Sequence, residues 1–417
     1  MKRFARIVAR DGVRAAVGRA LARLRTEVAG RCEAALIEAR FRRAERGRPV
    51  AAAQRASILV MDSFVPRSDR DAGSRRMLAI LELLCDLGYH AIFVPREGGK
   101  QRLEAARVRA RGIDVRTHDG DAARAIEGLR EPLALAWLAR PEIAAPFLPL
   151  LRKRFNVPVI YDTVDLHHLR LEREERVCGS PTRWQEMRDC ELGIARDATV
   201  TVVTSGYERA VLAHAGIDAE LLSIVESPVA SVLPLRDRGG LLYLGNFTHA
   251  PNRDAVTVLV QTILPLVRER IPGVALTIAG FDPAQWTRRF AGRGIRVLGH
   301  VADVEPLLQH ARVFTVPLRF GAGAKGKIVQ SLAHGLPVVT TPVGAEGLAL
   351  SDAIDVVVRE PGPSFAHAVV ALLNEDARWN EISAEAYRSA ARFSPAAARD
   401  ALSAILARAQ AAAPARA

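Results

Sequence analysis

The chain has 417 residues, 49% of them hydrophobic, and a formal net charge of +13 at pH 7. This length and composition allow two domains with separate cores and exclude a disordered or fibrous protein. No apolar stretch approaches the roughly 18 residues needed to cross a bilayer. Arginines interrupt every apolar run in the first 50 residues, so the sequence predicts no signal peptide.

The positive charge is concentrated at the N-terminus. Residues 1–50 hold 14 Lys or Arg and 5 Asp or Glu, a net of +9, which leaves +4 for the other 367 residues. Apolar residues recur there at helical spacing, so the segment is predicted to be a basic amphipathic helical arm. It packs on its own protein or a second subunit, or it lies on an anionic membrane surface. No nucleic-acid-binding motif is present, and no such partner is expected.

From Ser57 onward, short apolar runs alternate with helical patterns, which is typical of parallel sheets covered by helices. Helices are predicted over Arg75 to Leu87 and Pro141 to Phe155. The strands predicted for a first sheet are Ile58–Met61, Ala91–Val94, Leu133–Leu138, Val157–Tyr161 and Thr199–Val203. Those predicted for a second sheet are Leu241–Leu244, Leu276–Ala279, Val297–Leu298, Val313–Val316, Val338–Thr341 and Val356–Val358.

The two series indicate an α/β protein with two Rossmann-like, doubly wound domains that face a cleft. We place the first domain at residues 51–228, the second at 229–390 and a C-terminal helix at 391–417. The segment from Glu226 to Gly240, rich in Pro, Ser, Arg and Gly, is the expected linker.

The cysteines Cys32, Cys85, Cys178 and Cys190 lie far apart, without a C-x-x-C pair or a histidine at metal spacing. Cys178 and Cys190 are therefore interpreted as small buried apolar side chains. Free cysteines favour a cytoplasmic location.

The stretch RFGAGAKGKIVQSLAHGLPVVTTPVGAEG (319–347) is the most informative part of the chain. A glycine-rich loop follows an apolar strand and opens a helix, predicted over about Ala324 to Ala333. Gly321 and Gly323 permit close approach of a ligand, the helix N-terminus offers free N–H groups, and Lys325 and Lys327 add cationic donors. This pattern predicts a phosphate-binding site.

Lys327, Gln330, Gly335 and Pro337 follow a pattern like K-x-x-E-A-x-A-x-G-x-P-V-V. The stretch resembles the donor site of GT-B glycosyltransferases, specifically the large retaining family 4 (glycosyl transferases group 1). The resemblance implies a C-terminal helix that crosses back to the first domain. It also implies that Lys327 contacts the diphosphate of a nucleotide sugar, which serves as a co-substrate, so no separate cofactor is expected.

Two positions depart from that family pattern. Gln330 replaces the glutamate that holds the ribose, and a glutamine can still accept one hydroxyl and donate to another. Ala322 replaces a glutamate near the sugar, and we expect the backbone amides of Gly323 and Ala324 to serve the sugar instead. The resemblance further places Glu346 near the nucleotide.

The segment GNFTHAPNRDA (245–255) opens the second domain, where the family often has arginine and lysine phosphate contacts. Here Asn246 and Pro251-Asn252 stand in their places. We interpret Asn246 and His249 as cleft residues. Asn252 and Asp254 have an alternative role as caps of the following helix.

The loop after the first strand contains Asp71-Ala-Gly73-Ser-Arg-Arg. It resembles the glycine loop that faces the acceptor in GT-B glycosyltransferases, with Gly73 as the candidate site residue. The alternative is a plain connection in which Asp71 or Ser74 caps the next helix. Asp69 and Asp71 form a D-x-D pattern, which we interpret as accidental, so no metal is predicted.

A second candidate segment, YDTVDLHH (161–168), ends a strand that enters the expected cleft. Carboxylate and imidazole groups there are suited to orienting a sugar or relaying a proton. Asp165 and His167 are the candidate catalytic residues of this segment, with Lys327 as the third. His167 is preferred over His168, and the alternative is a loop histidine bonded to one of the aspartates.

The combined prediction is a cytoplasmic enzyme, peripheral at the inner face of the cell membrane, that moves a hexose from a nucleotide diphosphate to a glycan or lipid-linked acceptor. The resemblance implies retention of configuration and a role in bacterial polysaccharide or glycolipid synthesis. The alternative is a catalytically silent GT-B protein that binds a nucleotide sugar or a partner enzyme.

Overall fold

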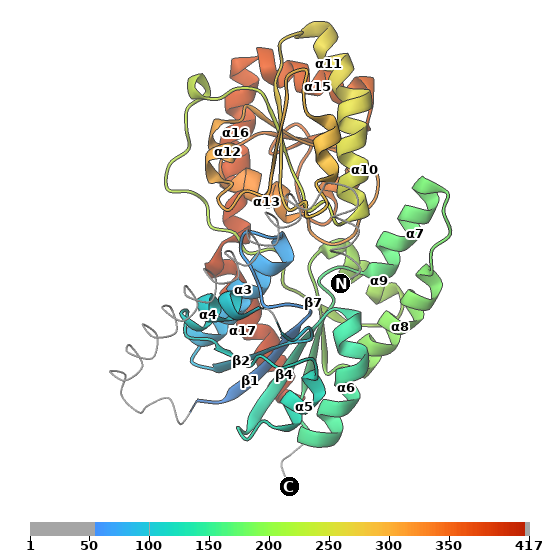
Figure 1. Ribbon diagram of the computed structural model, residues 1–417, viewed down its shortest axis with the longest axis vertical. Helices are drawn as coiled ribbons and strands as arrows, with labels where there is room; N and C mark the ends of the chain where they lie inside the picture. The colour runs from blue at the N-terminus through green and yellow to red at the C-terminus, as the bar shows by residue number, and fades with distance from the viewer. Residues whose placement is uncertain (1–54, 100, 413–417) are drawn as a thin grey trace, which may run out of the picture.

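A computed structural model describes residues 55–99 and 101–412. Two α/β domains lie end to end along the long axis of the molecule (Figure 1). The first contains a seven-stranded sheet of order β3-β2-β1-β4-β5-β6-β7, and the second a six-stranded sheet of order β10-β9-β8-β11-β12-β13. All strand pairs within both sheets are parallel. The GT-B fold class predicted from the sequence is confirmed.

The first domain is built from alternating strands and helices. Its strands are β1 (Ser57–Asp62), β2 (His90–Pro95), β3 (Asp114–Val115), β4 (Leu133–Ala139), β5 (Val159–Asp162), β6 (Val200–Val203) and β7 (Ala219–Leu221). Its helices are α3 (Ala72–Asp86), α4 (Arg102–Arg109), α5 (Ala122–Glu127), α6 (Pro141–Phe155), α7 (His167–Cys178), α8 (Trp184–Asp197) and α9 (Gly206–His214). β1 and β5 are buried at every residue because helices cover both faces of the sheet.

The second domain repeats this alternation. Its strands are β8 (Leu241–Leu244), β9 (Leu276–Ala279), β10 (Ile295–Gly299), β11 (Val313–Val316), β12 (Val338–Thr340) and β13 (Val357–Val358). Its α-helices are α10 (Ala250–Val258), α11 (Leu264–Arg270), α12 (Glu305–His310), α13 (Gly326–Ala333), α14 (Pro342–Ala345), α15 (Pro363–Asn374) and α16 (Asp376–Ala390). A π-helical turn, Leu259–Ile263, joins α10 to α11, and three short 3-10 helices are Leu235–Asp237, Trp286–Phe290 and Ala391–Phe393.

Local sequence explains where several helices begin. Asp71, Ser205 and Ser394 accept a backbone N–H with their side chains and cap α3, α9 and α17 (Pro395–Ala411). These short polar side chains satisfy N–H groups that have no partner within the helix. Asp71 therefore caps α3, as the plain-connection alternative expected.

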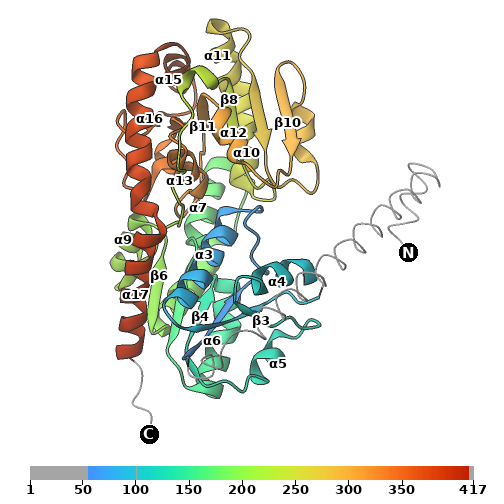
Figure 2. The same cartoon turned by 90° about the vertical axis from the view of Figure 1, so that its left-hand side faces the viewer.

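The last helix, α17, leaves the second domain and runs along the first (Figure 2). Its buried residues Leu402, Ile405, Leu406 and Ala409 belong to the same apolar cluster as residues of β1, α3 and β4. The core of the first domain is therefore completed by the end of the chain.

Other expectations from the sequence meet different outcomes. The predicted arm, residues 1–50, lies outside the described residues. Within the described part of the chain, no helix is long and apolar enough to cross a membrane.

Cys178 and Cys190 are exposed, so the interpretation as buried side chains is wrong. Both lie on the projecting α7–α8 helical pair, whose outer surface has no neighbour among the described residues to cover it.

Candidate functional site: the cleft between the domains

A cleft of about 480 Å³ lies where the two domains meet. Its walls come from the loop before α3 and from Arg140, which precedes α6, in the first domain, and from the loops after β8, β10 and β11 in the second. The candidate site residues that line it are Gly73, Asn246, His249, Ala324, Lys325, Lys327 and Gln330, together with Asp71, Arg140 and Asn252. The carboxyl ends of the strands of both sheets point toward this cleft, as expected for doubly wound domains.

The glycine-rich loop approaches the first domain closely. Gly323 has φ +68°, and a Cβ there would lie 2.9 Å from Cβ of Asp165. A Cβ at Gly326, the first residue of α13, would lie 2.4 Å from Cβ of Ala72. The glycines therefore let the N-terminus of α13 meet the N-terminus of α3 across the cleft.

Lys327 is a partly buried cation in the first turn of α13. Its ammonium group lies 2.5 Å from Oδ1 of Asn252 and 4.9 Å from the centre of the Tyr243 ring. The structure shows no ion pair between Lys327 and any described carboxylate. Burial lowers the pKa of Lys327 to about 7. A partly buried cation with neutral neighbours at a helix N-terminus is suited to receive an anion.

Lys325 is buried and lines the cleft. Its ammonium group donates to the carbonyl of Gly323 at 2.7 Å, which stabilises the turn before α13. Burial lowers its pKa to about 8, although Glu346 and Glu208 act in the opposite direction. Both lysines of the predicted phosphate site thus face the same cleft with depressed pKa values.

Polar groups of the second domain complete this wall. Asn246 accepts bonds from the backbone N–H and hydroxyl of Thr248, so its side chain is fixed in one orientation. Gln330 lines the cleft, and its backbone carbonyl accepts a hydrogen bond from the ring of His334. Burial lowers the pKa of His249, which favours the neutral imidazole.

The opposite wall belongs to the first domain. Arg140 donates to Asp62 at 2.8 Å, and its guanidinium would lie 3.0 Å from a Cβ at Gly73. Sequence analysis did not select Arg140, whose side chain is brought to the glycine loop by the strand order β1-β4. The wall opposite the lysines therefore contains a paired arginine.

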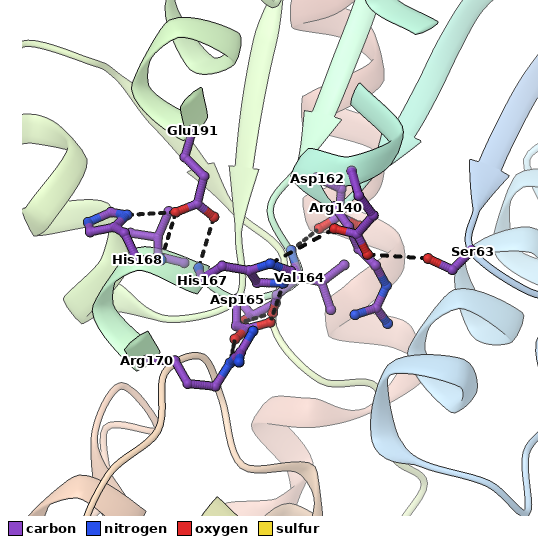
Figure 3. A network of polar contacts seen from close by, with 12 residues as sticks. Ser63, Arg140, Asp162, Val164, Asp165, His167, His168, Arg170 and Glu191 are labelled. Carbon is purple, nitrogen blue, oxygen red and sulfur yellow. Dashed lines mark hydrogen bonds and ion pairs between the residues drawn. The ribbon is translucent and has the colours of Figure 1, made fainter. Parts of the chain in front are cut away.

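Asp165 and His167 lie beside the cleft and do not line it. Nε2 of His167 lies 3.3 Å from Oδ1 of Asp165, and Arg170 donates to the same carboxylate at 3.0 Å (Figure 3). Burial would raise the pKa of Asp165, but His167 and Arg170 hold it well below its usual range. Burial would lower the pKa of His167, but Asp165 raises it. His167 pairs with an aspartate, as the alternative expected, but it is the first residue of α7 and does not lie in a loop. A catalytic role for the two residues stays a prediction.

His168 points away from this group. Its ring bonds to the fully buried Glu191 at 2.6 Å, and Glu191 also accepts the backbone N–H groups of His167 and His168 (Figure 3). Glu191 thereby caps α7, which has no capping side chain of its own at Leu166. Glu191 and His168 act as structural support for the N-terminus of that helix.

Three further candidate residues, Gly321, Glu346 and Ala324, form hydrogen bonds with side chains of the first domain. The carbonyl of Gly321 and the carboxylate of Glu346 both bind Arg173 of α7. The N–H of Ala324 donates to the hydroxyl of Thr204. In this arrangement the Ala324 amide is not free to serve a sugar, contrary to the expectation from the sequence.

The two carboxylates of the D-x-D pattern, Asp69 and Asp71, also accept hydrogen bonds from protein groups. Asp69 accepts from Arg67 and from His300 of the second domain, each at 2.9 Å, and Asp71 caps α3. Among residues 55–99 and 101–412, no group of three or more metal-binding side chains is arranged to hold an ion.

The second domain matches a known family. Residues 238–375 match the profile of the family described as Glycosyl transferases group 1. Among solved structures, a sucrose-phosphate synthase from Thermosynechococcus elongatus is 15% identical, with a TM-score of 0.65, over 83% of this chain and 96% of that one. HepE from Anabaena, solved with UDP-glucose, is 13% identical, with a TM-score of 0.66, over 84% and 99%. No curated protein sequence matches the chain.

The fold and the cleft thus define a two-domain protein of the GT-B class. The chain has the GT-B fold, and residues 238–375 match the glycosyl transferases group 1 family, as the sequence motifs predict.

Proposed function

We propose that the protein transfers a hexose from a nucleoside diphosphate to a hydroxyl of a glycan or lipid-linked acceptor, with retention of configuration. The bond between the sugar C1 and the diphosphate oxygen breaks, and a new bond joins C1 to the acceptor oxygen. The products are a glycoside, a nucleoside diphosphate and the proton of the acceptor hydroxyl. Bacterial polysaccharide or glycolipid synthesis is the expected setting.

The observation that carries this proposal is the environment of Lys327. It is partly buried, faces the cleft, and has Asn252 and Tyr243 as neighbours in place of a carboxylate. A nucleotide diphosphate would supply the missing negative charge, and the N-terminus of α13 would add N–H donors. Charge that develops on the departing diphosphate would be stabilised by Lys327 and Lys325.

Binding and transfer are tested separately. Thermal shifts with UDP, GDP, ADP and TDP identify the nucleotide, and the corresponding sugars follow. UDP is the first probe because HepE was solved with UDP-glucose. Lys327→Met should reduce the shift, whereas Arg111→Met, at an exposed residue that does not line the cleft, should leave it unchanged. The absence of any nucleotide-dependent shift would contradict the proposal.

A catalytically silent GT-B protein is the second candidate. Ala322 stands where the family resemblance implies a glutamate near the sugar, and it packs against an apolar cluster of the first domain. Donor hydrolysis and transfer distinguish the candidates: the silent protein binds the nucleotide sugar and leaves it intact.

We also propose that residues 1–50 attract the enzyme to an anionic membrane, because they carry a net charge of +9. The full chain should float with anionic vesicles at low salt, and a variant starting at Ala51 should remain folded and not float. Failure of the full chain to float, or unfolding of the shortened chain, would assign residues 1–50 a structural role.

A further inference from the structure

We propose that Arg173 is a positioning residue that couples closure of the two domains to the shape of the phosphate-binding loop. This inference rests on the proposed function of the cleft. Arg173 does not line the cleft, so it acts on the donor only through the loop.

The contacts of Arg173 join the domains at one point. From α7 of the first domain, its Nη1 donates to the carbonyl of Gly321 at 2.7 Å and to Glu346 at 2.8 Å. Its Nη2 donates to the other carboxylate oxygen of Glu346 at 2.9 Å. The side chains of Arg173 and Glu346 are 16% and 18% exposed, so water screens this pair only partly. The guanidinium also lies over the ring of Tyr207, which limits its movement.

The first domain holds the other end of the loop as well. The hydroxyl of Thr204 accepts the N–H of Ala324 at 3.1 Å, and it lies 3.1 Å from the buried carboxylate of Glu208. Between these two attachments, Gly323 lies directly against Asp165. The segment from Gly321 to Ala324 is thus fixed at both ends by groups that belong to the opposite domain.

This loop leads directly into the two cleft lysines. The carbonyl of Gly323 accepts the ammonium group of Lys325, and Lys327 follows in the first turn of α13. Separation of the domains would remove the contacts of Gly321 and Ala324 together. The loop would then lose the partners that fix its backbone, and the lysines would lose their defined positions.

The pair differs from a surface ion pair in its geometry. A bidentate arginine–carboxylate contact that also reaches a carbonyl fixes orientation as well as distance. Arg176, one turn further along α7, provides the contrast. It pairs with Glu172 on the same helix and is 73% exposed, and it forms no hydrogen bond or ion pair with a described residue of the second domain.

The test compares Arg173→Met with Arg176→Met in the full chain. Small-angle scattering without nucleotide should show a larger radius of gyration for Arg173→Met and no change for Arg176→Met. The donor KM should rise by about tenfold in Arg173→Met, with kcat changed by less than about twofold, because loss of positioning weakens ground-state and transition-state binding alike. If Arg173→Met has the radius of gyration and the donor KM of the wild type, the inference is overturned.

Two further variants keep the test decisive if Arg173→Met does not fold. Glu346→Gln retains one acceptor oxygen and should produce smaller changes in the same direction. The double variant Arg173→Glu, Glu346→Arg should recover part of the closed shape. A double variant no more closed than Arg173→Glu alone would overturn the pairing. If the wild type binds no nucleotide, the proposed function fails, whereas the scattering comparison still tests the interdomain contact.

Discussion

The ammonium group of Lys327 donates to the side-chain oxygen of Asn252 at the wall of the cleft. Asn252 is therefore a hydrogen-bond partner of this partly buried cation, whereas the sequence indicated a helix cap as its alternative role. An amide oxygen provides a partial negative charge only, so the full charge of the lysine remains available to a ligand. Because nucleotide binding would depend on the charge of Lys327, we expect it to be sensitive to pH.

Nucleotide affinity should decrease as the pH rises above 7. In the free protein the pKa of Lys327 is about 7, so the lysine is largely neutral at pH 8. A bound diphosphate favours the protonated form, so binding requires proton uptake and affinity falls by about tenfold per pH unit. Calorimetry in two buffers of different ionisation enthalpy measures this uptake. The uptake should decrease in Lys327→Met, and equal apparent enthalpies for the wild type in both buffers would contradict the expectation.

Lys327→Met should stabilise the nucleotide-free protein. The pKa of Lys327 is lowered from 10.5 to about 7 on folding, so the cost of burying its charge is fully present below pH 7 and disappears toward pH 10.5. Replacement by an apolar side chain should raise the free energy of unfolding by about 1 to 4 kcal/mol at pH 6. Denaturant titrations at pH 6 and pH 9 measure the difference, which should be smaller at pH 9. A less stable variant at pH 6 would show that Lys327 is better solvated than its surroundings indicate.

Gln330→Glu tests the assignment of the ribose position. Gln330 lines the cleft on the helix that carries Lys327. A carboxylate accepts from both ribose hydroxyls, so nucleotide affinity should stay the same or increase by a few-fold. Isothermal calorimetry with the nucleotide measures the change. A severe loss of affinity in a folded variant would place the ribose elsewhere.

The buried pair of Arg76 and Asp162 should dominate the stability of the first domain. The two side chains are 2% and 0% exposed, and Arg76 also donates to the carbonyl of Leu222 at 2.9 Å. Arg76→Ala leaves the carboxylate without its cation and should cost about 3 to 5 kcal/mol. Arg111→Ala, which breaks an exposed pair with Glu82, should cost about 1 kcal/mol or less. Equal midpoints in denaturant for the two variants would contradict this ranking.

Transferase activity should persist in excess EDTA. Asp69 is bound by Arg67 and His300, and cationic side chains face the cleft where a metal would otherwise neutralise the diphosphate. Activity is measured with EDTA alone and after addition of Mg²⁺ or Mn²⁺. Loss of activity that a metal restores would return Asp69 and Asp71 as candidate ligands.

The sequence was most informative where a segment is buried on both faces. The bounds predicted for Leu241–Leu244, Leu276–Ala279 and Val313–Val316 are those of β8, β9 and β11, because short apolar runs in α/β proteins become central parallel strands. β3 and β7 were not predicted. They contain two and three residues at the sheet edge and include Asp114 and Glu220, so they show no apolar run.

The site was predictable where its groups are close in sequence. The spacing of Lys325, Lys327 and Gln330 indicated one wall of the cleft, and all three line it. Gly323, predicted with them, packs against Asp165 beside the cleft. The contacts of Arg173 with Gly321 and Glu346 had no local signal, because the partners are 148 and 173 positions away. Contacts between domains depend on the relative orientation of the two sheets, which sequence periodicity does not encode.

The path of α17 has a consequence for how the chain is made. Leu402, Ile405 and Leu406 fill part of the core beneath α3, although they are synthesised more than 300 residues after it. During translation, the first domain emerges with an apolar groove that α17 covers later. The second domain, by contrast, has all of its strands once Val358 has been released. We expect the ribosome-bound chain to complete the second domain first, and the first domain to mature only as synthesis ends.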